Sequence, residues 1–536
     1  MRFVAQPVLV ALLAAASGVS ADIPGLPAPL SDADFRPINP AEAELGWLLF
    51  YDPVLSGNRD TACATCHHPA FGTSDGVSLG LGTRARGLGP GRVADPARPP
   101  VHRVPRNAPA LFNLGAWEVE TFFHDGRVAV DPQAPGGFAS PVGAALPARL
   151  AGPLAVQAIF PLVAPEEMAG EAADNPVGRA VAEDRLAGPD GAWELLVQRV
   201  VAIPGYAARL NMLHPEIAEG ARPADIADIG NALAAFMALE WRSDTSPFDA
   251  HLRGQAPLTG AAAQGMALFY GDAGCAACHA GPLLTDHGFH AMGQPQLGPG
   301  TRADGHDIGR AMVTGDGRDL YAFRTPSLRN VTLTGPWGHA GAFDDLGAYL
   351  QHHADPVAGV LRYAPQVVLP PLAGVQDWPV MEDPLGPALI AAAAGVDAPR
   401  RVLSAGEATA LLAFLDALED PEAVTGIFGI PDAVPSGLAV DAGGHPVTPS
   451  HAAGRWLKVQ PALPGSIAAL EARLGGKVQH HPLPAEGVRL GLGGAATVDL
   501  RATWADGQAS DWVTGVPSGA IVRLRRDGMR LVVEPD

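Results

Sequence analysis

Basic residues, cysteine and long apolar runs are all scarce in this chain of 536 residues. Lys and Arg total 36 against 56 Asp and Glu, which gives a formal net charge of −20. This acidic balance argues against a nucleic-acid partner and favours a basic or dipolar protein partner. Beyond the N-terminal segment, no stretch is long and apolar enough to span a membrane. The length exceeds that of one ordinary domain and suggests two or three.

The only four cysteines occur in two copies of one motif, Cys63-Ala64-Thr65-Cys66-His67 and Cys275-Ala276-Ala277-Cys278-His279. In a Cys-x-x-Cys-His motif the thiols attach a c-type haem through thioether bonds, and the histidine is an axial ligand of its iron. The alternatives are a structural zinc site and a thioredoxin-like redox pair. Zinc would require four clustered ligands, and a redox pair does not require the histidine. The doubled motif therefore predicts two covalently bound c-type haems.

The N-terminus has the pattern of a secretory signal peptide, in keeping with haem attachment outside the cytoplasm. Met1-Arg2 supplies positive charge, Val8 to Ala16 is an apolar run too short to span a bilayer, and Val19-Ser20-Ala21 is a small-residue cleavage site. We expect cleavage of residues 1–21, a mature chain from Asp22 without a membrane span, and a periplasmic location. An uncleaved N-terminal anchor is the alternative, although the apolar run is short.

A similar helix is expected before each haem motif. Residues 39–50 begin with a capping Asn and a Pro in the first turn, and their apolar residues recur at helical spacing. Residues 258–269 show the same approach to the second motif. A helix, a turn and a Cys-x-x-Cys-His motif form the plan of a cytochrome c domain, so we interpret the chain as an internal duplication. Further helices are expected at residues 192–201, 226–241, 344–353 and 404–418.

Irregular segments and a different C-terminal tail complete the expected organisation. Gly- and Pro-rich residues 71–109 and residues 281–319 are expected to be mostly loop. In the tail, residues 496–504 alternate apolar and polar side chains, as is typical of a β-strand, and two shorter β candidates follow at 520–524 and 531–533. The predicted fold is mainly α: two cytochrome c-like haem domains with long irregular loops, plus a small β-rich C-terminal appendage. Their expected limits are residues 22–245, 246–425 and 430–536.

These features resemble those of the bacterial di-haem cytochrome c peroxidase and MauG family over roughly residues 32–420. Further matching motifs are Arg106-Asn107-Ala108-Pro109, His124-Asp125-Gly126-Arg127, Pro165-Glu166-Glu167-Met168, Thr325-Pro326-Ser327-Leu328-Arg329-Asn330-Val331 and Gly338-His339-Ala340-Gly341. The resemblance implies a peroxide-reactive N-terminal haem with His67 as a ligand. It also implies a C-terminal haem, with His279 as a ligand, that stores or relays oxidising equivalents. It does not settle the subfamily.

The distal loop of the N-terminal haem departs from the peroxidases of this family. They often carry a distal histidine on a Ser-x-Gly-His-Gly loop, and this histidine must leave on activation. The matching loop is Ser78-Leu79-Gly80-Leu81-Gly82, with Leu81 at the histidine position. Because leucine cannot bind iron, the resemblance implies a sixth position that is open or holds water, as in the MauG-like branch. His68 and His102 are alternative ligands, but His68 adjoins His67 and is expected to point away.

Glu167 matches the family's distal acid in its Pro-x-Glu-Met motif. Cleavage of peroxide requires a group that takes a proton from one oxygen and returns it to the other. A carboxylate that faces haem in a poorly solvated pocket has a raised pKa suited to that transfer. The resemblance therefore assigns Glu167 as the catalytic acid-base residue. The alternatives are the neighbouring Glu166, or plain surface charge for both residues.

The sixth ligand of the C-terminal haem is a methionine in the peroxidases of the family and a tyrosine in MauG. Counted forward from the family's His-x-Gly motif, the methionine position falls on His353. The resemblance thus implies bis-histidine ligation of this iron by His279 and His353, and histidine lowers a haem potential relative to methionine. His352 is the first alternative, and Met312 and Tyr349 are weaker ones. Two solvent-facing histidines without a metal are the remaining interpretation.

Two further implications concern the space between the haems. The peroxidases have a tryptophan, as an electron relay, before the Asp-Gly-Arg motif, where this chain has His124. Trp117, Phe122 and Phe123 are alternative relay residues. The family also binds an inter-haem calcium ion with an Asn side chain and two backbone carbonyl groups, and oxygen ligands from irregular loops suit calcium. The matching residues of this chain are Asn107, Thr334 and Pro336.

The resemblance implies a periplasmic di-haem peroxidase that reduces hydrogen peroxide with electrons from a small cytochrome c or copper protein. An alternative is a MauG-like enzyme that uses peroxide to oxidise Trp or Tyr residues of a partner protein. Leu81 and the loss of the methionine ligand favour this alternative. A non-catalytic di-haem electron-transfer cytochrome is a second alternative, and Glu167 beside an open iron position argues against it.

Overall fold

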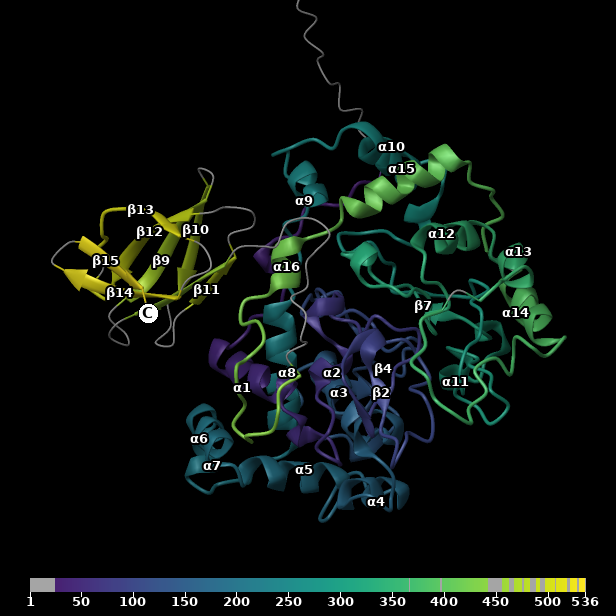
Figure 1. Ribbon diagram of the computed structural model, residues 1–536, viewed down its shortest axis with the longest axis horizontal. Coiled ribbons are helices and arrows are strands. Elements are labelled where there is room, and N and C mark those ends of the chain that lie inside the picture. Colours follow the sequence, from purple (N-terminus) through teal and green to yellow (C-terminus); the bar gives the residue numbers. More distant parts are fainter. Residues whose placement is uncertain are drawn as a thin grey trace, which may run out of the picture.

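The computed structural model is helix-rich and contains several small sheets (Figure 1). It describes residues 25–365, 367–395 and 398–441, and in the tail residues 456–461, 467–474, 477–482, 488–491, 497–506, 508–517, 521–527 and 530–535. The expected signal peptide at residues 1–21 lies outside the described residues. Within these ranges, none of the helices has the length and apolarity that a membrane crossing requires.

Between residues 25 and 245 the chain forms eight α-helices and five short strands. The helices are α1 (Pro40–Tyr51), α2 (Cys63–Cys66), α3 (Pro153–Ala158), α4 (Pro176–Ala182), α5 (Ala192–Val201), α6 (Pro204–Leu213), α7 (Pro215–Ala218) and α8 (Ile226–Glu240). The strands β1 (Ala85–Arg86) and β2 (Val93–Ala94) form one pair, and β3 (Thr121–Phe122), β4 (Val128–Val130) and β5 (Phe138–Ala139) form a three-stranded antiparallel sheet. The helices expected at residues 39–50, 192–201 and 226–241 are confirmed as α1, α5 and α8.

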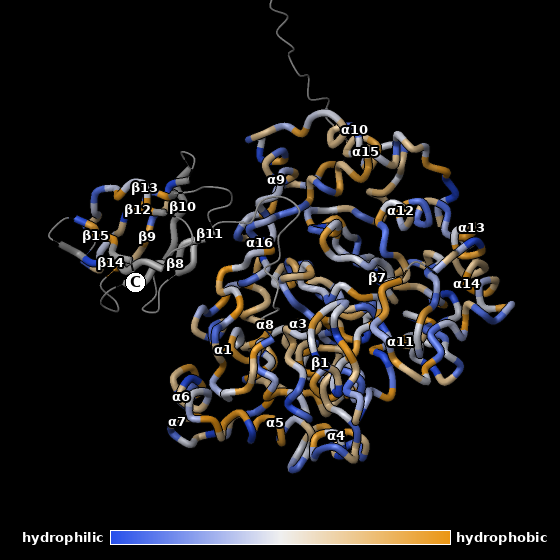
Figure 2. Tube along the Cα trace, in the orientation of Figure 1, coloured by the Kyte–Doolittle hydropathy of each residue, from blue (hydrophilic) through white to orange (hydrophobic). Residues whose placement is uncertain are grey.

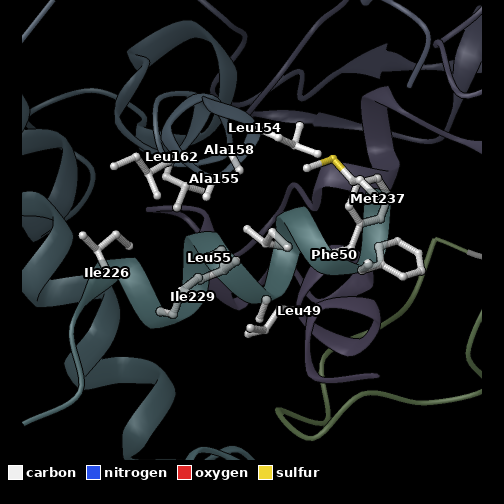
Figure 3. Close-up of a cluster of buried hydrophobic side chains, with 14 of the residues drawn as sticks. Leu49, Phe50, Leu55, Leu154, Ala155, Ala158, Leu162, Ile226, Ile229 and Met237 are labelled. Carbon is white, nitrogen blue, oxygen red and sulfur yellow. The ribbon is translucent and has the colours of Figure 1, made fainter. Parts of the chain in front are cut away.

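Helix α1 begins as its sequence indicates and packs closely on α8. The Asn39 side chain caps it by accepting a hydrogen bond from the backbone N–H of Ala41 (3.0 Å), and a proline occupies its first position. At the crossing with α8, a Cβ atom on Gly46 would lie 1.8 Å from the Ala232 carbonyl oxygen. Glycine therefore permits this contact. Around the crossing, buried side chains of α1, α3 and α8 form a shared core (Figure 3).

Between residues 246 and 441 the described chain forms eight more α-helices and one pair of short strands. These are α9 (Pro247–Leu252), α10 (Gly260–Tyr270), α11 (Ala311–Thr314), α12 (Leu346–Ala354), α13 (Pro356–Leu361), α14 (Gly386–Ala394), α15 (Ala405–Asp416) and α16 (Pro421–Thr425), with β6 (Phe289–His290) antiparallel to β7 (Phe323–Arg324). The helices expected at residues 258–269, 344–353 and 404–418 are confirmed as α10, α12 and α15. The expected loop at residues 281–319 contains β6 and α11 in addition.

The pair α10 and α15 repeats the geometry of α1 and α8. A Cβ atom on Gly265 would lie 1.8 Å from the Ala410 carbonyl oxygen, the same distance as at Gly46. Four residues after each glycine a phenylalanine packs on the partner helix, with ring centroids 5.1 Å apart for Phe50–Phe236 and for Phe269–Phe414. The apolar residues of both pairs can be followed in Figure 2. This repetition supports an internal duplication, while the expected domain limits stay predictions.

The described part of the C-terminal tail consists of β-strands with their own apolar core. The strands are β8 (Trp456–Pro461), β9 (Ile467–Leu474), β10 (Lys477–Pro482), β11 (Val488–Gly491), β12 (Thr497–Trp504), β13 (Val513–Pro517), β14 (Ile521–Asp527) and β15 (Arg530–Pro535). They form two four-stranded sheets in the orders β10-β9-β12-β13 and β11-β8-β14-β15, in which only the β8–β14 pair is parallel. Leu470, Leu500 and Trp504 are buried between neighbouring apolar side chains. The three expected strands are confirmed as β12, β14 and β15.

Candidate functional site

The first Cys-x-x-Cys-His motif forms helix α2, and His67 directly follows its last residue. The Nδ1–H of His67 donates a hydrogen bond to the backbone carbonyl of Thr73 (3.0 Å). Such a bond fixes the tautomer and orientation of the ring and leaves Nε2 as the atom that can bind a metal. Cys63, Cys66 and His67 all line a cavity of about 1750 Å³.

The second motif repeats this arrangement. The Nδ1–H of His279 donates to the backbone carbonyl of Leu284, again at 3.0 Å. Cys275, Cys278 and His279 line the same cavity as the first motif. Both histidines are therefore held with Nε2 available to bind a metal, and one continuous cavity reaches both pairs of thiols.

The state of the cysteines disfavours the alternatives to haem. All four are free of disulfide bonds. Burial raises the pKa of Cys63 and of Cys66 to about 12, which disfavours a redox nucleophile at either thiol. Ligand atoms of Cys278, Asp286 and His290 lie within 4.8 Å of one another. A structural zinc site requires four ligands, however, and His290 and Asp286 are already hydrogen-bonded to each other (2.9 Å).

His353 lies opposite His279 in the cavity. Their ring centroids are 6.2 Å apart, with 45° between the ring planes. An imidazole nitrogen binds a metal at about 2.0 Å, so two imidazoles on opposite sides of one iron place their ring centres roughly 6 Å apart. The Nδ1 atom of His353 is buried and has no hydrogen-bond partner in the part of the chain that the structure describes. This separation suits one iron between the two rings.

The alternative ligands of this iron are less well placed. His352 is buried against Phe343, with ring centroids 4.9 Å apart, and does not line the cavity. Tyr349 lines the cavity, and its hydroxyl accepts a hydrogen bond from the Gln294 side chain (3.1 Å). Met312 is 47% exposed and does not line the cavity. Of the two adjacent histidines, only His353 therefore faces His279.

Glu167 lies in a single turn of π-helix (Pro165–Ala169) on the wall of the cavity. Burial, and then the charge of the neighbouring Glu166, raise its pKa to about 7, and Arg127 opposes this rise. A carboxyl group with a pKa near neutrality can both accept and return a proton. The charge of Glu167 also acts on the thiols of Cys63 and Cys66, which shows that it is close to the first motif.

The loop Ser78–Gly82 packs directly against Glu167. A Cβ atom on Gly82 would lie 2.2 Å from the Glu166 carbonyl oxygen and 2.3 Å from that of Glu167. Gly80 lines the cavity, whereas Leu81 is fully buried outside it, so this loop presents no metal ligand to the cavity. Only glycine at position 82 permits the loop and the acid to share one wall.

A segment from the other half of the chain holds this loop in place. The backbone N–H of Ser78 donates to the Val368 carbonyl (2.8 Å), and the Val368 N–H donates back to the Ser78 hydroxyl (3.0 Å). Nearby, the buried Arg103 pairs with Asp377 (2.7 Å) and donates to the Pro370 carbonyl (2.7 Å). The loop is therefore fastened to residues 367–378.

The two other candidate ligands of the first iron do not reach the cavity. His68 is buried, with Nδ1 accepting from the Ala70 N–H (3.1 Å) and Nε2 at 3.3 Å from the Asp441 carbonyl. His102 is exposed. Neither of them lines the cavity.

Comparisons with known proteins identify relatives of this chain. A protein-family model described as di-haem cytochrome c peroxidase matches residues 40–257. The methylamine utilization protein MauG of Methylorubrum extorquens is 33% identical over 322 residues, which cover 59% of this chain and 70% of that protein. The cytochrome c551 peroxidase of Pseudomonas aeruginosa is 26% identical over 322 residues, covering 60% of this chain and 74% of that protein. A crystal structure of a MauG-like protein associated with microbial copper homeostasis aligns with a TM-score of 0.49 and 24% identity, over 75% of this chain and 96% of that one.

This chain belongs to the di-haem cytochrome c peroxidase family. It is accordingly a di-haem peroxidase, and its family implies two c-type haems. The two motifs, the anchored Nδ1 atoms of His67 and His279 and the shared cavity fit these groups.

A buried ionic network links the two halves of this di-haem peroxidase beside the cavity. Arg106 donates to both oxygens of Asp307 (2.7 and 2.9 Å) and to Asp125 (2.7 Å). His124, at the position of the family's tryptophan, lies with Nε2 at 3.1 Å from the Asn107 carbonyl. Its pKa is lowered to about 4, mainly by burial and then by the Arg106 charge, so the ring is neutral at pH 7.

Some of the alternative electron-relay residues line the cavity, and so do the expected calcium ligands. Phe122 and Phe123 line the cavity, whereas Trp117 is 53% exposed and does not. The Asn107 amide donates to the backbone carbonyls of Val77 (2.9 Å) and Ser78 (3.2 Å). The three expected calcium ligands, Asn107, Thr334 and Pro336, all line the cavity. The calcium ion and the relay residue stay predictions.

Three further polar residues, Asp75, Arg324 and His339, line the cavity, and the sequence assigned no role to any of them. Arg324 and His339 belong to or adjoin family motifs, but nothing local distinguished them from packing residues. His339 stacks on Phe323 with 3.9 Å between ring centroids. Asp75 is buried next to the first motif, and burial raises its pKa to about 7. Nothing in the Gly-rich sequence around Asp75 indicates that this carboxyl group is buried beside the first motif.

Proposed function

We propose that this chain is a periplasmic enzyme that reduces hydrogen peroxide to water with electrons from a small cytochrome c or copper protein. The observation that carries the proposal is Glu167, a buried acid on the wall of the cavity that also contains His67. The net charge of −20 supports a basic or dipolar electron donor, since complementary charge speeds association. A cleavable signal at residues 1–21 and a periplasmic location are part of the proposal.

The residues around the first motif would hold and expose one haem. A haem attached to Cys63 and Cys66 would supply iron for cleavage of the O–O bond and storage of oxidising equivalents. His67 would bind this iron through Nε2, because its Nδ1–H is held by the Thr73 carbonyl. The loop containing Leu81 would supply no ligand to this iron, so peroxide could react there without prior reductive activation.

Glu167 would move the protons. As a carboxylate it accepts a proton from hydrogen peroxide, and as an acid it returns a proton to the oxygen that departs as water. Two electrons and two further protons complete the reduction of one peroxide to two waters. Burial and Glu166 raise the pKa of Glu167, and Arg127 opposes them, so both protonation states are available at neutral pH. Arg127 is itself held by Asp125 (3.0 Å) and lies over the Phe123 ring.

The second motif would serve electron transfer. His279 and His353 would bind the second iron on both sides and thereby exclude peroxide from it. The relatively low potential that a second imidazole confers favours storage of an oxidising equivalent at this site.

A second candidate function is oxidation of Trp or Tyr residues of a partner protein. The histidine at position 353, in place of methionine, and the loop fastened without a distal histidine favour this candidate. The 33% identity to a methylamine utilization protein MauG is in keeping with it.

One experiment distinguishes these functions. The fully oxidised protein is mixed with hydrogen peroxide while its absorption spectrum is followed, and peroxide consumption is then measured with a reduced small cytochrome c. Rapid oxidation of the donor, with two electrons per peroxide, is the expected result. A long-lived oxidised spectrum with little donor turnover would instead support the second candidate. An unchanged spectrum without donor oxidation would contradict both.

A further inference from the structure

The cavity is lined by seven arginines, and one of them differs from the rest. Six have a carboxylate partner within 4.0 Å, whereas Arg324 has none among the described residues. The six pairs are Arg106 with Asp307 and Asp125, Arg127 with Asp125, Arg302 with Asp304, Arg318 with Asp316, Arg329 with Asp249, and Arg401 with Glu407. The charge of Arg324 is therefore uncompensated by the protein part that the structure describes.

The guanidinium of Arg324 also makes few hydrogen bonds. Its Nε–H donates to the Phe123 carbonyl at 3.3 Å and one Nη1–H to the Thr325 carbonyl at 3.4 Å, both near the upper limit for such bonds. A guanidinium has five N–H donors in a planar fork. Most of these donors are thus left for a group within the cavity. Burial alone lowers the pKa of Arg324 to about 10.

The backbone of Arg324 is rigidly placed between the two halves of the chain. Arg324 lies in β7, which pairs with β6, and its N–H donates to the His124 carbonyl (2.8 Å). The neighbouring acids Asp125 and Asp307 are both engaged with Arg106. His124 and His339 are neutral at pH 7, because burial lowers their pKa values to about 4 and about 3. No acid in the described surroundings is therefore left to pair with Arg324.

An unpaired cation in a poorly solvated place is costly unless an anion joins it. The forked donors of arginine match a planar carboxylate. The anions that two haems would bring into this cavity are their propionate carboxylates. We propose that Arg324 is the counter-ion of a haem propionate and holds that haem at the contact between the two halves. This inference rests on the proposed binding of haem by the two motifs.

The proposal gives Arg324 an effect on redox potential. A cation beside the propionate cancels its negative charge and disfavours the more positive, ferric state of that haem. Removal of the cation stabilises the ferric state, so the midpoint potential of that haem falls. An exposed arginine of equal charge has a far smaller effect, because solvent and salt screen it.

The test is spectroelectrochemical titration of both haems in the wild type, Arg324→Gln, Arg324→Lys and the control Arg318→Gln. Arg318 is 90% exposed at the side chain and is paired with Asp316. In Arg324→Gln we expect one haem to shift toward oxidation by about tenfold in its equilibrium constant, which is about 59 mV for one electron. Arg324→Lys is expected to retain most of the wild-type potential, and Arg318→Gln all of it. The haem content should stay at two per chain, because the thioether bonds do not involve Arg324.

Equal potentials in the wild type and a folded, haem-loaded Arg324→Gln protein would overturn the proposal. If that variant does not fold, resonance Raman spectra of the wild type and Arg324→Lys provide the test through the propionate bending band. An unchanged band would contradict the contact between Arg324 and the propionate. A wild-type potential that varies with inorganic phosphate at constant ionic strength would show that Arg324 holds a solution anion instead. None of these measurements requires turnover, so a haem-loaded protein that fails to reduce peroxide would refute the proposed function and leave this inference testable.

Discussion

The rings of His279 and His353 face each other across 6.2 Å, although His279 follows the second Cys-x-x-Cys pair and His353 lies in α12. If both bind one iron, replacement of His353 by Ala removes a strong-field ligand, and one low-spin haem becomes high-spin. We expect complete loss of one low-spin signal in absorption and electron paramagnetic resonance spectra. His352→Gln is the matched control, since His352 lies outside the cavity, and should leave both signals unchanged. An unaltered spectrum of His353→Ala would move the ligand assignment to another residue.

Replacement of Glu167 by Gln should slow the reaction with peroxide by about 10²- to 10⁴-fold, the usual contribution of a general acid-base group. The amide preserves the size of the side chain but cannot accept the proton. Stopped-flow spectroscopy with excess peroxide measures the rate, and haem content should stay at two per chain. The control Glu166→Gln should change the rate by no more than a few-fold. A Glu167→Gln protein with the wild-type rate would refute the role of this acid.

The rate of the peroxide reaction should rise with pH and reach half its plateau near pH 7. The sign follows from the chemistry: the carboxylate is the form that accepts a proton, and burial raises the pKa of Glu167 to about 7, so the carboxylate fraction grows through this range. Below that pH the rate should fall about tenfold per pH unit. The same titration should be absent in Glu167→Gln. A rate independent of pH between 5 and 9 in the wild type would contradict the assignment.

Gly82→Ala should destabilise the wall that contains Glu167, because its Cβ would lie 2.2 Å from the Glu166 carbonyl oxygen. The neighbour is backbone and cannot move aside cheaply, so we expect a loss of about 1–3 kcal/mol of stability together with slower peroxide cleavage. Gly91→Ala is the control from the same Gly-rich region, where a Cβ atom would have no neighbour within 4 Å. Thermal unfolding and stopped-flow rates of the two variants provide the comparison. Equal behaviour would show that the close approach is unimportant.

The sequence predicted those features of the molecule that depend only on residues close together in the chain. Asn39 and Pro40 define the start of α1 through contacts within one turn, and the Cys-x-x-Cys-His spacing is complete within five residues. The sequence did not predict the helices α3, α4, α6, α7, α9, α13 and α16. Each has a proline at its N-terminus, and all except α6 are too short for an apolar period to emerge.

The sequence could not predict features that depend on contacts between residues far apart in the chain. The adjacent residues His352 and His353 have the same chemistry, and only the packing of α12 decides which one faces His279. Likewise, seven arginines line the cavity, and they differ in whether the fold places a carboxylate close enough to form an ion pair. Arg324 differs because no described residue supplies it with a carboxylate partner, and only the folded structure reveals this.

The two hydrogen bonds between Ser78 and Val368 also bear on the order in which the chain folds. This contact joins residues 290 positions apart, and such distant pairs form late because a long loop must first close. During synthesis, the first Cys-x-x-Cys-His motif emerges long before the segment that completes the wall of its cavity. We therefore expect the cavity beside the first motif to close only when the second half of the chain has folded onto the first.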